Sequence, residues 1–246
     1  MNWIYRLLLV FTITGSNGHA VVLDIAHRGY AADNPESTLL AFRQAHHQGA
    51  DGIEFDVRQS SDGVLVVTHD SSIATLGNRL VNNTTFSDIY LETEIPSLEA
   101  VLIFAKQVNQ TIWLEIKQSH LYPNIIPNVL ELIAKYDLES KTVIQSFNHR
   151  DLDTIKKIQP NIRLLALFTS NFAFNRVPAG VDYIGLPMSN QYKNVSLVNR
   201  LHTLGKQVIF WRNNDLSETK QSVEAFINIG ADGLMLDRSL RRILQD

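Results

Sequence analysis

The feature that most constrains the fold of this 246-residue chain is a regular alternation of two kinds of segment. From residue 21 onward, short β-branched or apolar runs alternate with stretches in which apolar residues recur at helical spacing. This alternation is typical of a parallel sheet covered by helices, because each helix carries the chain back to begin the next parallel strand. Eight strands are expected, over residues 21–26, 52–57, 111–117, 142–146, 162–167, 182–185, 207–211 and 233–237.

The predicted helices fall between these strands. Their ranges are 38–48, 97–108, 124–136, 149–158, 195–204 and 217–229, and a last helix over 239–244 closes the chain. An open doubly wound sheet is the alternative, but no G-x-G-x-x-G sequence follows a strand, so its dinucleotide-binding signature is missing. The length suits one α/β domain built as a (β/α)8 barrel.

A short phrase recurs where predicted helices end and strands begin. Gly-Ala-Asp-Gly occurs at 49–52 and again at 230–233, with a looser copy at 180–183. A glycine suits the end of a helix because it tolerates a positive φ angle. The repetition therefore supports a barrel made of similar units and says little about chemistry.

Composition excludes several classes of protein. The chain is 45% hydrophobic and 19% charged, which is typical of a globular domain and not of a disordered one. It has no cysteine, so disulfides, thiolate zinc sites and thiol catalysis are excluded. The net charge of -3 argues against a broad basic surface, and nucleic acid is not an expected partner.

Residues 1–20 have the layout of a signal peptide. Arg6 precedes the apolar run 7–13, and Gly18 and Ala20 are small residues at the -3 and -1 positions of a cleavage site. The run is shorter than the ~20 residues that span a bilayer, so no membrane anchor is expected after processing. The sequence predicts an exported protein, periplasmic or secreted, with a single domain over 21–246. The alternative is that residues 1–20 form a buried first element.

Polar side chains gather where the predicted strands end. The active sites of such barrels lie at the C-terminal ends of the strands, and side chains two residues apart share one face. Three carboxylates on such faces repel one another unless a cation lies between them, and oxygen ligands suit Ca2+ or Mg2+. The residues at these ends are His27, Arg28, Glu54, Asp56, Glu115, Lys117 and Trp211.

The stretch that follows the second strand is too short for a parallel crossover, so we expect a hairpin. A two-residue turn at Asp62-Gly63 places His69 opposite Asp56, whereas a turn at Ser61-Asp62 places it opposite Glu54. In either register His69 returns to the carboxylate pair.

Two histidines beside a cation indicate phosphoryl-transfer chemistry. Arg28 and Lys117 are placed to hold an anion, and a metal ion offsets further charge on a phosphate. One imidazole can remove a proton from the nucleophile while the other protonates the leaving oxygen. The ordinary histidine pKa of about 6.5 suits both roles near neutral pH.

The same residues resemble the glycerophosphodiester phosphodiesterase family, over nearly all of the predicted mature chain and in the family's order. The resemblance implies a TIM barrel and a metal-dependent hydrolysis of glycerophosphodiesters to sn-glycerol 3-phosphate and an alcohol. The segment 49–70 is its most specific part. The other matching segments are His27-Arg28-Gly29, 34–38, 95–98, 114–117, Ser146-Phe147 and 230–233.

The resemblance also implies a role for each site residue. Glu54, Asp56 and Glu115 look like the ligands of one divalent cation, Ca2+ or Mg2+. His27 resembles the general base and His69 the general acid, an assignment that leaves the reverse order open. Arg28 and Lys117 are similar to the phosphate-binding cations, and Glu36 to a supporting carboxylate. Apart from the resemblance, the position of Trp211 at the C-terminal end of a strand favours contact with the substrate, with barrel packing as the alternative.

Departures from the family pattern leave the alcohol open. Ser37 replaces the usual Asn, Arg212 and Leu236 each replace a usual Thr, and the segment 71–94, which caps the site in the family, is short. One alternative is a lysophospholipase D- or sphingomyelinase D-like phosphodiesterase, which needs an apolar rim facing a membrane. Another is a non-catalytic barrel that binds glycerophosphodiesters. The sequence leaves the oligomeric state open.

Overall fold

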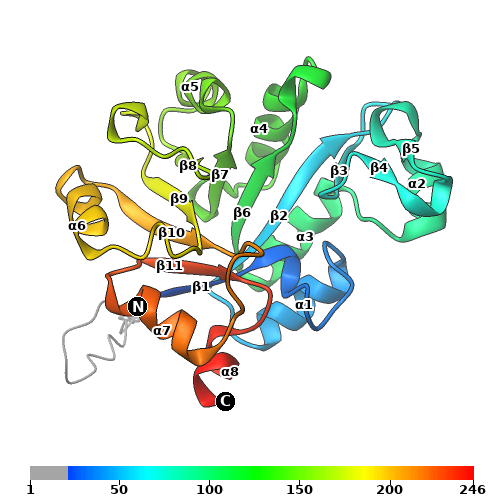
Figure 1. Cartoon of the computed structure of the whole chain (residues 1–246). Coiled ribbons are helices and arrows are strands. Elements are labelled where there is room, and N and C mark those ends of the chain that lie inside the picture. Colours follow the sequence, from blue (N-terminus) through cyan, green and yellow to red (C-terminus); the bar gives the residue numbers. More distant parts are fainter. Residues whose placement is uncertain (1–21) are drawn as a thin grey trace, which may run out of the picture.

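The structure is a computed structural model that describes residues 22–246, so the predicted signal peptide lies outside the described residues. Within that range, eight parallel strands close into a barrel in the order β1-β11-β10-β9-β8-β7-β6-β2, and pairing of β1 with β2 completes the ring (Figure 1). The predicted α/β barrel is confirmed. The strands are β1 (Leu23–Ala26), β2 (Gly52–Gln59), β6 (Thr111–Ile116), β7 (Thr142–Ser146), β8 (Arg163–Leu167), β9 (Tyr183–Pro187), β10 (Gln207–Trp211) and β11 (Gly233–Leu236).

Helices surround this ring and match the predicted ranges to within a few residues. Several begin at a side-chain cap: Thr38, Ser97 and Thr219 each accept a backbone N–H of the first turn. Between residues 22 and 246, no helix combines the length and apolarity required to cross a membrane. The helices are α1 (Leu39–His47), α3 (Leu98–Val108), α4 (Ile125–Lys135), α5 (His149–Ile158), α6 (Val195–Thr203), α7 (Lys220–Asn228) and α8 (Leu240–Gln245).

Alternation of side chains along the strands separates two apolar clusters. One cluster fills the space between strands and helices and includes Ile53 and Phe55 of β2. The other lies inside the barrel and includes Ile25, Trp113 and Ile209. Because β2 points Phe55 outward, its neighbours Glu54 and Asp56 point inward. The same two-residue period therefore builds the core and directs acidic side chains into the barrel.

The hairpin after β2 is present, but both predicted registers are wrong. Strand β3 (Leu65–Val67) runs antiparallel to β2, with Val57 opposite Val67 and Gln59 opposite Leu65. The loop has three residues, 61–63, and ends at Gly63 with a φ of 86°. A three-residue loop that ends in a left-handed glycine shifts the pairing by one position relative to either two-residue turn. Thr68 then donates its N–H to the Asp56 carbonyl at 3.0 Å, so His69 still arrives at the end of β2.

Segment 71–94 forms a small structure of its own that no sequence pattern indicates. It contains the paired strands β4 (Ser72–Ile73) and β5 (Arg79–Leu80), followed by helix α2 (Phe86–Thr93). Ile73, Val81 and Ile89 pack with Val66 in a separate apolar cluster. The strands are too short to show an alternating pattern. The segment lies beside the end of β2 and β3 (Figure 1).

The repeated phrase serves two physical purposes. Its first glycine ends a helix with a positive φ, 84° at Gly49 and 96° at Gly230, as predicted, whereas Gly180 has no positive φ. Its second glycine leaves room inside the barrel. A Cβ atom on Gly52 would lie 2.5 Å from Trp113 Nε1, and one on Gly233 would lie 2.8 Å from Ile209 Cδ1. The phrase therefore both turns the chain and admits large interior side chains.

We predict that Gly52→Ala lowers the free energy of unfolding by about 1–3 kcal/mol, because the new methyl group overpacks the interior against Trp113. Urea denaturation measures the change. Gly180→Ala is the matched control, since within the described residues its Cβ would meet only Lys156 Cγ, at 3.5 Å, and a shift within about 1 kcal/mol is expected. Equal stabilities for the two variants would contradict the conclusion that Gly52 leaves room for the Trp113 side chain.

Candidate active site

A cavity of about 230 Å³ opens at the C-terminal ends of the barrel strands. It gathers all the predicted site residues except Glu36. Glu36 stands just outside, where its Oε2 accepts a hydrogen bond of 3.1 Å from Arg28 Nη1. The lining residues are His27, Arg28, Glu54, Asp56, His69, Glu115, Lys117 and Trp211, together with Gln145, Phe147, Leu167, Arg212 and Met235.

Three buried carboxylates form the floor of this cavity. Glu54 and Asp56 of β2 and Glu115 of β6 each offer an oxygen, and these oxygens all lie within 4.8 Å of one another. Burial, together with the charge of Asp56, raises the pKa of Glu54 to about 7 and that of Glu115 to about 8. Asp56 Oδ2 is buried and has no hydrogen-bond partner among residues 22–246. A cluster of carboxylate oxygens with one orphaned atom fits a hard divalent cation.

Two cationic side chains reach the cluster from its edges. Lys117 Nζ lies 3.0 Å from Asp56 Oδ1 and 2.8 Å from Glu115 Oε1. Arg28 Nε lies 3.6 Å from Asp56 Oδ2, and the Arg28 backbone N–H donates to Glu54 Oε2 at 3.1 Å. Although burial alone would raise the pKa of Asp56, the charges of Lys117 and Arg28 lower it. Both cations also line the cavity, where an anion could meet them.

Arg28 is held in this position by unusual backbone geometry. Its φ of 49° lies in the left-handed region, which costs free energy for a residue other than glycine. The next residue, Gly29, has a φ of 81°, and a Cβ there would lie 2.6 Å from Ala41 Cβ. The tight turn after β1 thus aims the Arg28 N–H at Glu54 and its guanidinium at Asp56.

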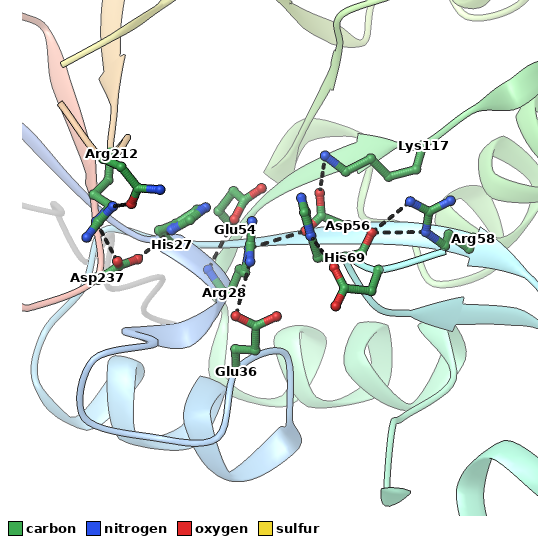
Figure 2. Close-up of polar contacts among 12 residues, drawn as sticks. His27, Arg28, Glu36, Glu54, Asp56, Arg58, His69, Lys117, Arg212 and Asp237 are labelled. Carbon is green, nitrogen blue, oxygen red and sulfur yellow. Dashed lines mark hydrogen bonds and ion pairs between the residues drawn. The ribbon is translucent and has the colours of Figure 1, made fainter. Parts of the chain in front are cut away.

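His27 is part of a chain of charged groups that begins at the end of β11. Its Nδ1 lies 2.5 Å from Asp237 Oδ1, and Asp237 Oδ2 lies 2.7 Å from Arg212 Nε. Figure 2 shows His27 between this Arg212–Asp237 pair and Glu54. Burial alone would lower the pKa of His27, but the bond to Asp237 and the charge of Glu54 raise it. Because Asp237 occupies Nδ1, Nε2 is the nitrogen left for other contacts.

A further carboxylate supports Asp237 from behind. Glu218 Oε1 accepts the Asp237 backbone N–H at 2.7 Å and lies 4.0 Å from Arg212 Nε. Burial raises the pKa of Glu218 to about 7. Asp237 is therefore held at its backbone by Glu218 and at its side chain by His27 and Arg212.

His69 occupies a more open position on the opposite wall. Its Nδ1 lies 2.9 Å from Asp70 Oδ1, and its side chain is 35% exposed, compared with 16% for His27. Arg58 fixes this loop, since its Nε and Nη2 donate to the His69 carbonyl at 3.0 and 2.7 Å. Figure 2 shows the Arg58 guanidinium beside His69, with dashed lines to the His69 carbonyl. Each histidine thus has its own carboxylate partner at Nδ1, Asp237 for His27 and Asp70 for His69, but the two differ in burial.

Sequence reasoning misses several residues of the site. Gln145, which donates to Glu54 Oε1 at 2.8 Å, and Asp237 both lie at strand ends with inward parity, so a full survey of strand ends would find them. Arg58 has the same parity as Glu54 and Asp56 at the end of β2, so the same survey would include it. Glu218 gives no such signal, because it lies on no strand and its partner is the backbone N–H of Asp237, which no local pattern encodes.

Comparison with known proteins agrees with this geometry. The profile of the glycerophosphoryl diester phosphodiesterase family matches residues 27–241. A glycerophosphodiester phosphodiesterase from Bacillus altitudinis is 33% identical over 233 residues, covering 86% of this chain and 93% of its own length. One from Caldanaerobacter subterraneus subsp. tengcongensis is 30% identical over 232 residues, covering 87% and 93%.

Solved structures share the fold at lower sequence identity. A phosphodiesterase from Oleispira antarctica, solved with the product sn-glycerol-3-phosphate, has a TM-score of 0.79 at 22% identity and covers 91% of this chain and 97% of that one. A glycerophosphodiester phosphodiesterase from Agrobacterium tumefaciens has a TM-score of 0.74 at 23% identity, with 89% and 97% covered. These likenesses confirm the TIM barrel.

The barrel and its acidic mouth define a hydrolase-type active site on a TIM-barrel scaffold. The chain belongs to the glycerophosphoryl diester phosphodiesterase family, as the resemblance predicted, and is an enzyme of the phosphoric diester hydrolase class.

We predict that the metal-free protein loses stability as pH rises from about 5 to about 8. The pKa values of Glu54 and Glu115, about 7 and about 8, lie above the ordinary value of 4.5, so the folded state binds more protons than the unfolded state in this range. Urea midpoints in chelator should therefore fall with rising pH, and added Ca2+ or Mg2+ should raise them most at the alkaline end. In Glu115→Gln the urea midpoint should fall less steeply with pH, because one of the two raised pKa values is removed. A midpoint that rises with pH in the wild-type protein would refute the prediction.

We also predict that Asp237→Asn lowers the pKa of His27, because the charge and hydrogen bond of Asp237 raise it. Titration of the imidazole signals by NMR in the metal-free protein measures the shift. Asp70→Asn is the control, since Asp70 contacts His69 and should leave the His27 signal in place. An unchanged His27 titration in Asp237→Asn would show that the two groups are not coupled.

Proposed function

We propose that this chain hydrolyses glycerophosphodiesters to sn-glycerol 3-phosphate and an alcohol in a metal-dependent reaction. The observation that carries the proposal is a single cavity that joins two histidines, two cationic side chains and three buried carboxylates. Family membership supports it, as does the product bound to the Oleispira antarctica relative.

Glu54, Asp56 and Glu115 would hold one divalent cation, Ca2+ or Mg2+. Their oxygen-only chemistry and mutual distances of at most 4.8 Å fit such an ion better than zinc, for which imidazole or thiolate ligands would be expected. When bound, the ion would offset negative charge on the substrate phosphate. Gln145 Nε2 donates to Glu54 Oε1, and the Arg28 backbone N–H donates to the other oxygen, Oε2.

Arg28 and Lys117 bind the phosphate oxygens in this proposal. Both border the cavity, and Glu36 orients the Arg28 guanidinium through its hydrogen bond. Trp211 and Phe147 meet edge to face, with ring centres 5.8 Å apart, and form an aromatic wall beside the phosphate position. The positive charges of Arg28 and Lys117 attract the phosphodiester, and the aromatic wall limits its orientation.

His27 is the base and His69 the acid. Asp237 holds Nδ1 of His27, which leaves Nε2 to accept a proton from the nucleophile, and the Asp237 charge stabilises the imidazolium that results. His69, on the more exposed wall, gives a proton to the leaving oxygen and can exchange protons with solvent. The difference in burial between the two histidines favours this order over its reverse.

A coupled assay for released glycerol 3-phosphate tests the proposal with glycerophosphocholine, glycerophosphoethanolamine and a lysophospholipid as substrates. We expect hydrolysis of the first two, loss of activity with chelator and recovery with Ca2+ or Mg2+. His27→Ala should lower kcat by about 10²–10⁴-fold, as removal of an acid/base group does. Full activity after exhaustive chelation, or in His27→Ala, would refute the mechanism. Cleavage of the lysophospholipid alone would favour the related lysophospholipase D-like activity, and tight binding without product would favour a non-catalytic barrel.

We also propose that the protein is exported to the periplasm or secreted, on the pattern of residues 1–20. Mass spectrometry of protein made in a secreting host should find a mature N-terminus at Val21. An intact N-terminus at Met1 on exported protein would contradict it.

A further inference from the structure

The mouth of the barrel is electrostatically divided. The segments that follow β6, β7, β8 and β9 at this end, residues 117–124, 147–150, 168–176 and 188–194, contain no Asp or Glu. Asp151, which follows Arg150 in the first turn of α5, is buried and accepts a hydrogen bond from Asn148 Nδ2. We call these four segments the basic arc, because they carry Lys117, His120, His149, Arg150, Arg176 and Lys193. The segments after β1, β3, β10 and β11 contain the carboxylates Asp33, Glu36, Asp70, Asp215, Glu218 and Asp237.

Arginines of the two halves differ in whether a carboxylate neutralises them. Arg28 and Arg212, in the acidic half, each form ion pairs. Among residues 22–246, no carboxylate lies within ion-pair distance of Arg150 or Arg176. Arg176 donates through Nη1 to the Asn171 carbonyl at 3.1 Å, and its remaining donors have no partner in the described part of the chain. Both guanidinium groups are thus available to an anion.

The two arginines border a hollow that continues from the catalytic cavity. This hollow, about 430 Å³, is also lined by Asn148 and Asn171, and it shares Phe147 and Leu167 with the cavity. A group attached to a phosphate in the cavity can therefore extend across Phe147 toward Arg150 and Arg176. The hollow on the other side of the cavity also has two arginines, Arg28 and Arg212, but there Glu36 and Asp237 pair with them.

We propose that the leaving alcohol occupies the hollow beside Phe147 and that the enzyme favours alcohols that carry a second phosphate group. Of the two substituents of a glycerophosphodiester, glycerol is neutral, so only the alcohol can bring charge to the unpaired arginines. Guanidinium groups bind phosphate oxygens through several parallel hydrogen bonds. The inference rests on the proposed function, because it names the substrate class of that same site.

The test compares kcat/KM for glycerophosphoinositol phosphate, glycerophosphoinositol and glycerophosphocholine. The first two differ only in the second phosphate, so their ratio isolates its effect. We expect the phosphorylated substrate to be favoured several-fold, mainly through a lower KM. Arg150→Gln and Arg176→Gln should each lower the ratio about two- to five-fold, the range of exposed ion pairs, and added salt should lower it as well.

Lys157→Gln is the matched control. It removes the same charge from the exposed last turn of α5, the helix whose first turn carries Arg150, and Lys157 does not line the hollow. The ratio should be the same as in the wild-type protein. Because the three substituted side chains are exposed, the variants should unfold at the wild-type temperature, which circular dichroism can verify.

A ratio of one or below in the wild-type protein, or an unchanged ratio in the double variant of Arg150 and Arg176, would overturn the inference and leave the proposed function standing. Hydrolysis of none of the three substrates would overturn the proposed function, and the inference with it. Binding to phosphatidylglycerol vesicles that depends on the two arginines, without preference among the soluble substrates, would assign the basic arc to a membrane surface instead.

Discussion

The balance of charge at the floor of the barrel mouth is the constraint on which the site depends. Three carboxylates lie buried within a few ångströms of one another, and burial of like charges is costly unless cations offset them. Lys117 supplies part of the offset, and the strained turn after β1 supplies Arg28 and a backbone N–H. The pKa values of Glu54 and Glu115 remain high because these contacts are insufficient. This residual demand for positive charge is the physical reason that the cluster could bind a metal ion.

The barrel and the centre of the site can be predicted from the sequence because both follow from a local rule. Residues two apart in a strand share a face, so the strand pattern alone groups Glu54 with Asp56, and Glu115 with Lys117. The hairpin shows how far such reasoning reaches. Its existence follows from length alone, whereas its register depends on whether Gly63 ends the loop or forms half of a two-residue turn, and the sequence permits both.

The remainder of the site depends on contacts between distant parts of the chain. His27 and Asp237 are separated by 210 positions, and they meet only because β1 and β11 are neighbours in the closed ring. Glu218 accepts the backbone N–H of Asp237, a group that almost every residue possesses, so nothing in the sequence marks this target. Gln145 and Asp237 could be predicted, because both occupy inward-facing positions at strand ends. A neutral amide and a single Asp, however, are weaker indications of a site than a cluster of acids.

The two halves of the barrel mouth differ in whether carboxylates pair with their arginines. Arginines in the acidic half are paired: Arg28 lies beside Glu36 and Asp56, and Arg212 lies beside Asp237, the partner of His27. The arginines of the basic arc have no such partners between residues 22 and 246, so their charge extends into solvent over about 8–10 Å, the screening length at physiological salt. In the proposed mechanism, catalytic alignment uses arginines that have carboxylate partners, whereas the proposed selection of the alcohol uses arginines that have none. One barrel mouth can hold both kinds, because neighbouring loops can differ in composition without disturbing the strands beneath them.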